Sequence, residues 1–378
     1  MFGKAARSKA PSVSFGESTV TDTAPCQKTL TLHVKPEAIG PIRAAVLAEF
    51  QREANLPGFR KGKAPVDLVQ RQYGKSIQDE TLHRVTKTTL EETAKTHHLK
   101  PVGPFEIRDV KLSETDGLRF EAVVEVEPVF ALGAYKGIHV PEGSDAVTPE
   151  ELEQALKSLQ ESSAELVPGN EGEPKQRKVL PLDDELAKDL GLKDLAALRA
   201  HVEAKLREQK RVANARAREA ALSEELLKRH AFDVPPRLVS HQTERLTRDF
   251  TVRLLLSGAP EEQAKQETAK FTEQLRQAGE RHVKLSFIID RVAEQEQVTV
   301  TQQELVERLW QLSQRWKKDP AEVRKILDAQ GLWPSVYSAI RQEKTMSLLL
   351  AAAVITNGSA QPSIVSSGTG EREGSHAQ

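Results

Sequence analysis

Apolar and polar residues alternate in three short stretches of the amino-terminal part of the chain, and this period of two is that of a half-buried β-strand. The dipeptide Asp116-Gly117, between the second and third stretches, is a typical hairpin turn. The predicted strands are Lys28–Val34, Val102–Leu112 and Leu118–Val126. Together they predict a small antiparallel sheet.

The residues between the first two predicted strands have helical spacing instead. One helix is predicted to open at Pro36 and to end before Pro57. A second is predicted to begin near Pro65, and a third to run from about Ser76 to His97. Helices packed on one side of a small antiparallel sheet make this part of the chain an α+β domain.

From about Leu182 to Ile355, apolar residues recur at helical spacing through almost the whole chain. Thr301 and Glu304 form a capping box at one helix start, and a final helix is predicted from about Pro334 to Ile355. Most of these apolar stripes serve as ordinary core between antiparallel helices. Aromatic residues are only 4% of the chain, however, which is typical of an elongated all-α architecture whose long helices need not close into one globule.

Between these two parts lies a short segment that begins with a strong helix start. Thr148 is an N-cap, Pro149 takes the first helical position and Glu151 the third. The polar, turn-rich residues 168–174 follow, and neither an aromatic residue nor a strand pattern is present between Leu159 and Val179. The sequence therefore predicts five segments, which are a flexible tail (1–25), the α+β domain (26–142), a helix with a polar connector (143–180), the helical domain (181–356) and a disordered tail (357–378).

One stretch is arranged for a surface contact and not for a core, namely Gly58-Phe59-Arg60-Lys61-Gly62-Lys63-Ala64-Pro65. Two glycines and a proline prevent a continuous helix or strand, so we expect a tight projecting loop. Three cations and one aromatic residue suit an RNA phosphate or an acidic protein patch, although an ordinary solvated basic turn has the same composition. A P-loop is excluded because only three residues separate Gly58 from Gly62, and Ala64 stands where Ser or Thr would be needed.

The sequence contains no recognisable catalytic, metal or cofactor site. Cys26 is the only cysteine, which rules out an intramolecular disulfide and fits a reducing compartment. His97 and His98 are adjacent at a predicted helix end and lack further ligands, and Asp183-Asp184 fits a helix cap. We therefore predict no metal and no cofactor.

Bulk properties limit the partners. A net charge of -1 means that any attraction to RNA must be local. Neither a signal peptide nor a membrane-spanning apolar run is present, so we expect a cytoplasmic protein without a membrane partner.

The loop and its surroundings, Asn55 to Tyr73 (NLPGFRKGKAPVDLVQRQY), closely resemble the ribosome-docking loop of bacterial trigger factor. A looser resemblance covers Lys28 to Val140 and includes Glu125–Phe130 and Tyr135–Gly137, and it resumes at Lys178–Glu185 and continues weakly through the helical remainder. Trigger factors carry an inserted proline isomerase domain similar to the FK506-binding proteins. Residues 143–180 are too short for that domain, which is expected to be missing.

The resemblance implies an ATP-independent chaperone that docks at the ribosomal exit site and shields nascent chains. The ribosome-binding residues would be Gly58, Phe59, Arg60, Lys61, Gly62, Lys63 and Pro65. The implied partners are the large ribosomal subunit, through an exit-site protein and rRNA, nascent or unfolded polypeptides, and a second copy in a homodimer off the ribosome. Links to protein transport and cell division follow from the same resemblance.

Two alternatives stay open at this point. The chain could be a peptidyl-prolyl isomerase, as full-length trigger factors are, although no aromatic-lined proline pocket can be found. It could also be a helical assembly adaptor that kept the loop for another partner. Which helical faces bind substrate cannot be read from the sequence.

Overall fold

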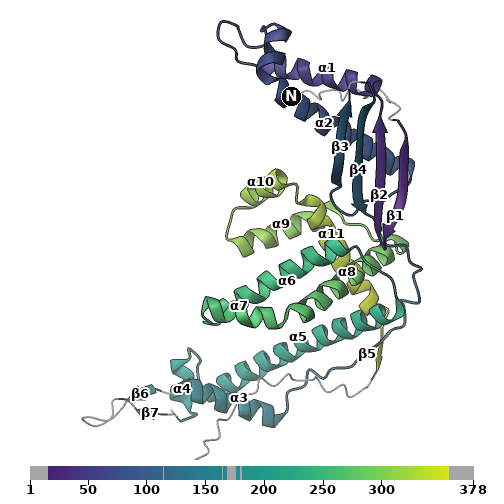
Figure 1. Ribbon diagram of the computed structural model, residues 1–378. Coiled ribbons are helices and arrows are strands. Elements are labelled where there is room, and N and C mark those ends of the chain that lie inside the picture. Colours follow the sequence, from purple (N-terminus) through teal and green to yellow (C-terminus); the bar gives the residue numbers. More distant parts are fainter. Residues whose placement is uncertain (1–15, 114, 164, 168–175, 179–180, 357–378) are drawn as a thin grey trace, which may run out of the picture. The chain divides into compact units, whose positions relative to one another are not determined.

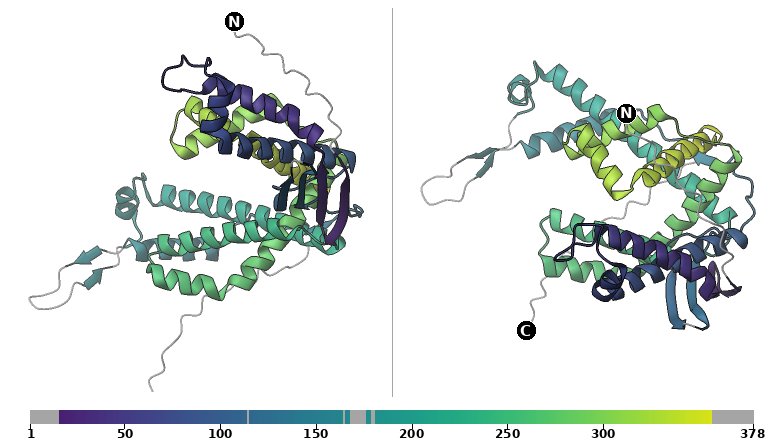
Figure 2. Two further views of the ribbon diagram at one scale, coloured as in Figure 1. Left: turned by 45° about the horizontal axis from the view of Figure 1, so that its top comes forward. Right: turned by 90° about the horizontal axis from the view of Figure 1, so that it is seen from above.

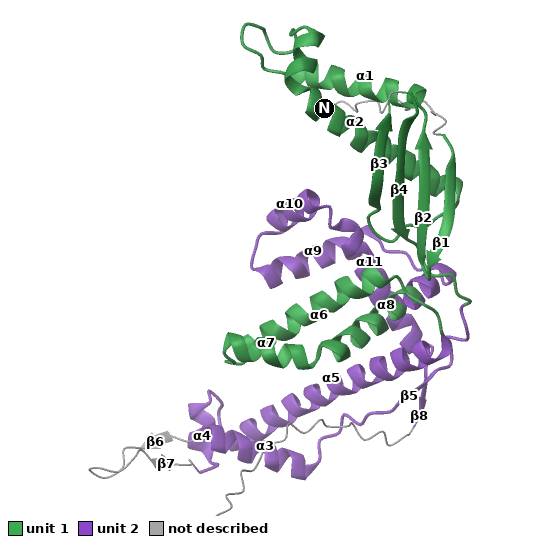
Figure 3. Cartoon of the chain, in the orientation of Figure 1, with its two compact units in different colours: residues 1–131, 231–287 green, residues 132–230, 288–378 purple. Residues whose placement is uncertain are grey.

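The computed structural model describes residues 16–113, 115–163, 165–167, 176–178 and 181–356. The chain forms two compact units, each built from two separate stretches of sequence (Figure 3). Unit 1 comprises residues 1–131 and 231–287, and unit 2 comprises residues 132–230 and 288–378. The five consecutive segments expected from the sequence stay a prediction.

The sheet of unit 1 has four antiparallel strands in the order β1-β2-β4-β3. They are β1 (Ser18–Ala24), β2 (Gln27–Val34), β3 (Glu106–Ser113) and β4 (Gly117–Glu125). Helices α1 (Pro36–Glu53) and α2 (Val66–Thr96) run side by side and cover one face of the sheet (Figures 1 and 2). The predicted α+β amino-terminal domain is thus confirmed.

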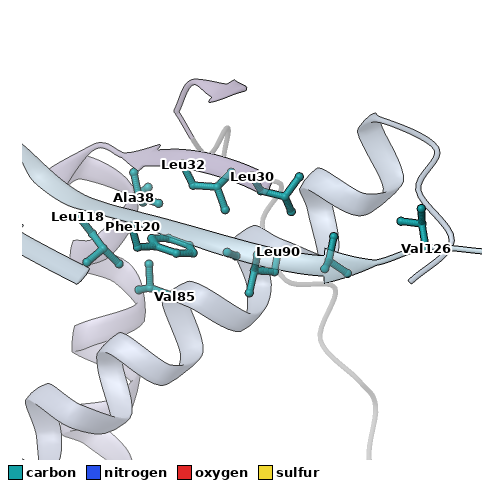
Figure 4. Close-up of a cluster of buried hydrophobic side chains, with 11 residues drawn as sticks. Leu30, Leu32, Ala38, Val85, Leu90, Leu118, Phe120 and Val126 are labelled. Carbon is teal, nitrogen blue, oxygen red and sulfur yellow. The ribbon is translucent and has the colours of Figure 1, made fainter. Parts of the chain in front are cut away.

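Alternating residues of β2 and β4 fill the space between this sheet and its helices. Leu30, Leu32 and Phe120 are almost fully buried and pack against Val85 and Leu90 of α2 (Figure 4). Burial of a large aliphatic or aromatic side chain contributes roughly 1.5–3 kcal/mol, so burial in this cluster stabilises the α+β part strongly.

Strand β1 was not predicted from the sequence. Residues 1–25 were expected to be a flexible tail, but Ser18–Ala24 form an edge strand in antiparallel register with β2. Its β-branched residues favour a strand, yet Val20 is the one side chain that packs against the core, so no clear alternation marks it. Residues 1–15 lie outside the described part of the chain.

The rest of unit 1 is helical. It contains α6 (Pro236–Leu256), α7 (Glu261–Lys270) and the first two thirds of α8 (Thr272–Gln295). Residues before and at the start of α6 attach this part to the sheet, because Phe232 stacks on Phe130 with ring centroids 4.1 Å apart and the Arg237 amide donates to Glu125 Oε1 at 2.8 Å.

Unit 2 is also largely helical, which confirms the predicted all-α character of the carboxy-terminal part. It holds the end of α8 and six further helices, which are α3 (Pro149–Ser162), α4 (Asp184–Asp189), α5 (Leu195–Arg229), α9 (Gln302–Trp316), α10 (Pro320–Gln330) and α11 (Trp333–Ala351). Both predicted helix starts are confirmed, since Thr148 with Glu151 and Thr301 with Glu304 form complete capping boxes.

Two short sheets of unit 2 differ from what the sequence predicted. The last helix was predicted to reach Ile355, but it ends at Ala351, and β8 (Val354–Thr356) pairs in parallel with β5 (His139–Pro141). The connector was expected to lack strands, yet β6 (Glu165–Val167) and β7 (Gln176–Lys178) form an antiparallel pair. The turn-rich residues 168–175 and the predicted tail 357–378 lie outside the described residues.

Candidate functional site

The predicted projecting loop joins the end of α1 to the start of α2 (Figure 1). It contains two successive turns, in which the Phe59 amide donates to Leu56 O at 3.1 Å and the Lys63 amide to Arg60 O at 2.9 Å. Gly58 and Gly62 have φ angles of +86° and +80°, in the left-handed region that side chains disfavour. Both glycines are therefore required by the path of the backbone.

The base of this loop is held by a small core of its own. Ala54 and Ala64, on either side of the tip, are 6% and 1% exposed and pack with Val46, Val69 and Ile77. The Gln51 side-chain amide donates to Ala64 O at 2.8 Å, which ties the end of α1 to the far side of the loop. The loop is therefore presented by a fixed frame.

An ion pair holds the two helices of this frame together. The Arg84 guanidinium of α2 donates to both carboxylate oxygens of Glu49 of α1, at 3.0 and 2.6 Å, and also to Glu80 Oε1 at 2.6 Å. These hydrogen bonds lower the pKa of Glu49 below its ordinary value. A bidentate arginine–carboxylate pair fixes geometry as well as contributing energy.

The tip of the loop presents the residues that the sequence singled out. Phe59 is 40% exposed, and Arg60, Lys61 and Lys63 are exposed as well. Within the described part of the chain, no carboxylate lies within ion-pair distance of these three cations. Gly58 and Pro65 are exposed and Gly62 is half-buried. Three cations without a carboxylate partner among the described residues can receive an anionic partner without first breaking internal ion pairs.

Two apolar residues beside the loop were not predicted to belong to the site. Val66 and Leu68, in the first turn of α2, are 40% and 39% exposed. Their neighbour Val69 alone takes the fully buried core position of that turn. This turn has three large apolar residues, Val66, Leu68 and Val69, but one fully buried core position. That excess is the sequence signal that could have revealed Val66 and Leu68. With Phe59 they add apolar surface to a cationic tip.

A second candidate surface lies in unit 2, where α9, α10 and α11 border a groove of about 390 Å³. Its lining is mainly apolar and aromatic, and Arg324 is its charged member. The Trp333 indole donates to Asp328 Oδ1 at 2.7 Å, which fixes the orientation of that ring. The other apolar lining residues are Leu305, Val306, Leu309, Pro334 and Tyr337.

Exposed apolar side chains continue beyond this groove. Val306 is 54% exposed, Trp310 one turn later is 59% exposed, and Tyr337 is 37% exposed. All three tryptophans of the chain, Trp310, Trp316 and Trp333, lie on these helices. Their clustering within 24 residues is the sequence signal that could have revealed this apolar surface.

Unit 1 has a further exposed apolar surface at the end of α6. Val252, Leu255 and Leu256 are 51%, 41% and 83% exposed, and Phe271 after α7 is 42% exposed. Exposed apolar groups that gather in this way indicate binding to other macromolecules.

The described residues contain neither a group of three possible metal ligands nor a helix long and apolar enough to cross a bilayer. Cys26 donates to Asp233 O at 3.3 Å, and burial together with the nearby carboxylates of Asp233 and Glu125 raises the pKa of its thiol. A raised pKa keeps the thiol protonated near neutral pH, which is the reverse of an activated nucleophile. His97 is the C-cap of α2 and lies 3.0 Å from Ser18 Oγ.

Two family models match most of the chain. The model described as bacterial trigger factor protein (TF) matches residues 17–159, and that described as bacterial trigger factor protein (TF) C-terminus matches residues 194–351. The trigger factor of Shouchella clausii (strain KSM-K16) is 24% identical over 410 residues, which span 85% of this chain and 94% of that protein. The trigger factor of Anaeromyxobacter sp. (strain Fw109-5) is 23% identical over 425 residues, or 89% and 98% of the two chains.

A solved structure described as "Promiscuous Substrate Recognition in Folding and Assembly Activities of the Trigger Factor Chaperone" is similar to this chain with a TM-score of 0.48. It is 18% identical in sequence, and the match covers 89% of this chain and 99% of that one.

The comparisons also show a difference in length. The two family models leave residues 160–193 unmatched, and no isomerase domain was found between them. The alignment with the Shouchella protein runs over 410 residues, whereas 85% of 378 residues is about 321, so about 89 aligned positions have no counterpart in this chain.

Proposed function

Because the chain belongs to the trigger factor family, we propose that it is an ATP-independent chaperone that docks at the exit site of the large ribosomal subunit and shields nascent polypeptides. The family supports the chaperone role, and the docking residues are proposed from this chain's own loop.

One observation carries the proposal of docking. Phe59, Arg60 and Lys61 stand exposed on a loop whose base is packed and hydrogen-bonded, and the two cations have no carboxylate partner among the described residues. Cations that have no carboxylate partner within the folded chain can bind an external anion. An rRNA phosphate or an acidic side chain of an exit-site protein would supply that anion. The aromatic ring would add buried apolar area at the centre of that contact.

The exposed apolar surfaces support the second half of the proposal. A chaperone without nucleotide chemistry must act by binding equilibrium, since it covers apolar client segments and releases them when burial inside the client becomes more favourable. The groove between α9 and α11, with Val306 and Trp310 beside it, offers apolar area on a helical frame.

We further propose that the protein is not an isomerase, that it works in the cytoplasm and that it needs no cofactor. The short stretch between the two family matches supports the first point, because residues 160–193 are far fewer than an isomerase domain needs. A homodimer off the ribosome belongs to the same proposal, and so do the domain boundaries expected from the sequence, apart from the amino-terminal tail, which β1 shortens.

Cosedimentation with large ribosomal subunits tests the docking. The variant carries Phe59→Ala, Arg60→Ala and Lys61→Ala, and the matched control carries Val110→Ala, Lys75→Ala and Lys87→Ala, which also removes one exposed apolar residue and two exposed cations from unit 1. The loop variant should bind at least tenfold more weakly, about 1.4 kcal/mol, because an aromatic anchor and two charge-assisted contacts are lost together. The control should bind as the wild type does. If both variants pellet like the wild type while circular dichroism shows them folded, this loop does not dock the chain.

A further inference from the structure

The middle of α5 carries far more positive charge than the rest of the chain. Residues 205–218 (KLREQKRVANARAR) contain six Lys or Arg and one Glu, which gives a local charge of +5 in a protein whose net charge is -1. The other 364 residues therefore sum to -6. Figure 1 shows α5 as one continuous helix through this stretch, which we call the cationic segment.

The cationic segment does not serve the core of unit 2. The buried residues of α5 are Leu198, before the segment, and Leu222 and Leu226, after it. Leu198 packs with Leu156 and Ala187, so the helix is anchored at its start by α3 and α4. The segment between the anchors is exposed over most of its surface.

One side of the segment is held by the chain that precedes α3. Lys210 Nζ donates to Ala146 O at 2.7 Å and to Glu151 Oε2 at 2.6 Å, and the Asn214 side chain donates to Asp145 Oδ1 at 2.7 Å. These contacts fix how the helix is turned, and therefore which cations face outward.

Internal ion pairs neutralise only part of the charge. Arg207 pairs with Glu203 at 2.6 Å and Arg211 with Glu208 at 2.7 Å. For Lys205, Arg216 and Arg218, no carboxylate lies within ion-pair distance in the part of the chain that the structure describes. Arg207 and Arg211 are also four residues apart, a spacing at which like charges destabilise a helix. The segment therefore retains positive charge that no ion pair of the described chain neutralises.

Two of these unpaired cations lie on one side of the helix. At 100° per residue, Lys205 and Arg216 fall within about 20° of each other and about 16 Å apart along the helix axis, on the side roughly opposite Lys210 and Asn214. Both are exposed, whereas Arg218, on another side, is half-buried. Unpaired cations spaced in this way suit an extended polyanion better than a single anion.

The same surface is poor in apolar area. Val212, at 36%, is the large apolar residue of the segment that is exposed, so the surface differs from the groove beside Trp310. Four of the six cations are arginines, whose planar guanidinium matches phosphate in two-point contacts. Both features favour nucleic acid over an unfolded polypeptide as the partner.

We propose that the cationic segment of α5 is a second RNA-binding element, which contacts the phosphate backbone independently of sequence. The inference rests on the proposed ribosome docking only for the identity of the RNA. The charge, the exposure and the geometry that support it are those of the cationic segment, which lies in unit 2. The loop would fix where the chain docks, and α5 would strengthen attachment to neighbouring rRNA.

The test measures binding of the full-length chain to a short fluorescent RNA hairpin by anisotropy at several salt concentrations. All proteins carry the alanine substitutions at residues 59–61, which remove the loop's contribution. The test variant adds Lys205→Gln, Arg216→Gln and Arg218→Gln, and the matched control adds Arg315→Gln, Lys318→Gln and Lys325→Gln, which removes the same charge from exposed positions of unit 2. Glutamine has nearly the helix propensity of Lys and Arg, so both variants should fold.

The test variant should bind the hairpin at least tenfold more weakly at low salt. Its slope of log affinity against log salt should fall in magnitude by about 2 to 3, since each phosphate contact contributes about 0.7–0.9. The control should keep the affinity and slope of its parent. Equal affinity and slope in test variant and control would overturn the proposal, as would polyglutamate that competes as well as unlabelled RNA.

Failure of the two proposals can be told apart. If the wild type binds the hairpin through α5 but does not pellet with ribosomes, the ribosome docking is wrong and the RNA-binding element stands. If ribosome binding depends on Phe59–Lys61 while the affinity for the hairpin is unchanged by the α5 substitutions, the docking proposal stands and the proposed RNA-binding element on α5 is wrong.

Discussion

Removal of exposed apolar area beside the α9–α11 groove should weaken client binding more than removal of equally exposed area elsewhere. The variant carries Val306→Ser and Trp310→Ser, two positions one turn apart on α9 that are 54% and 59% exposed. The control carries Val110→Ser and Val129→Ser, which are 47% and 95% exposed in unit 1. Neither pair is part of a buried core, so both variants should keep the fold.

The magnitude follows from the exposed area. An indole side chain can bury up to about 250 Å², so the 59% of Trp310 that is exposed offers about 150 Å² and, at about 25 cal/mol per Å², about 3.7 kcal/mol. The exposed half of Val306 adds about 1 kcal/mol, from about 2 kcal/mol for complete burial. A client that covers about half of this area would lose about 2 kcal/mol in the variant, which is roughly a thirtyfold loss of affinity.

The assay has two readouts. Anisotropy of a labelled, permanently unfolded client gives the affinity, and light scattering of a chemically denatured client shows whether aggregation is suppressed without added nucleotide. The groove variant should bind roughly thirtyfold more weakly and suppress aggregation less, while the control matches the wild type. A folded groove variant that retains full affinity would refute the assignment of this surface to client binding.

Three further predictions concern stability and catalysis. Arg84→Met should lower the free energy of unfolding by about 1 kcal/mol, measured by urea titration, because a bidentate but partly exposed pair with Glu49 is lost, and Lys87→Met serves as the control. Contacts with Lys344 and Thr301 lower the pKa of Glu304 to about 2, so this group stabilises the fold above its ordinary pKa of 4.5 and the contribution disappears as pH falls towards 2. The difference in melting temperature between wild type and Glu304→Gln should therefore be largest above pH 4.5 and shrink towards pH 2, and a constant difference would contradict it. The purified chain should leave the rate of proline isomerisation in a short peptide unchanged, and acceleration in proportion to protein concentration would show an isomerase site.

Local chemistry explains which parts of the structure could be predicted from the sequence. The helix starts at Thr148 and Thr301 were recognisable because a capping box involves residues three apart. The loop was recognisable because glycines, cations and an aromatic residue occur together between two helices. Such signals need no knowledge of distant parts of the chain.

Most of the features that could not be predicted from the sequence depend on contacts between distant parts of the chain. The final helix ends early because Val354–Thr356 pair with His139–Pro141, more than 200 residues away, and no local pattern reveals that partner. Strand β1 was missed because its residues are mostly exposed at a sheet edge. The exposure of Val66 and Leu68, and the clamp of Arg84 on Glu49, likewise depend on how α1 and α2 pack.

Photocrosslinking from the loop tip to the ribosome tests the central claim most directly. A photoreactive phenylalanine analogue replaces Phe59 in one protein and Val110 of β3, which is also exposed, in another, and both are irradiated with translating ribosomes. The account predicts crosslinks from position 59 to protein or rRNA of the large subunit beside the exit site, and none from position 110. Absence of large-subunit crosslinks from position 59, or equal crosslinking from both positions, would contradict docking through this loop.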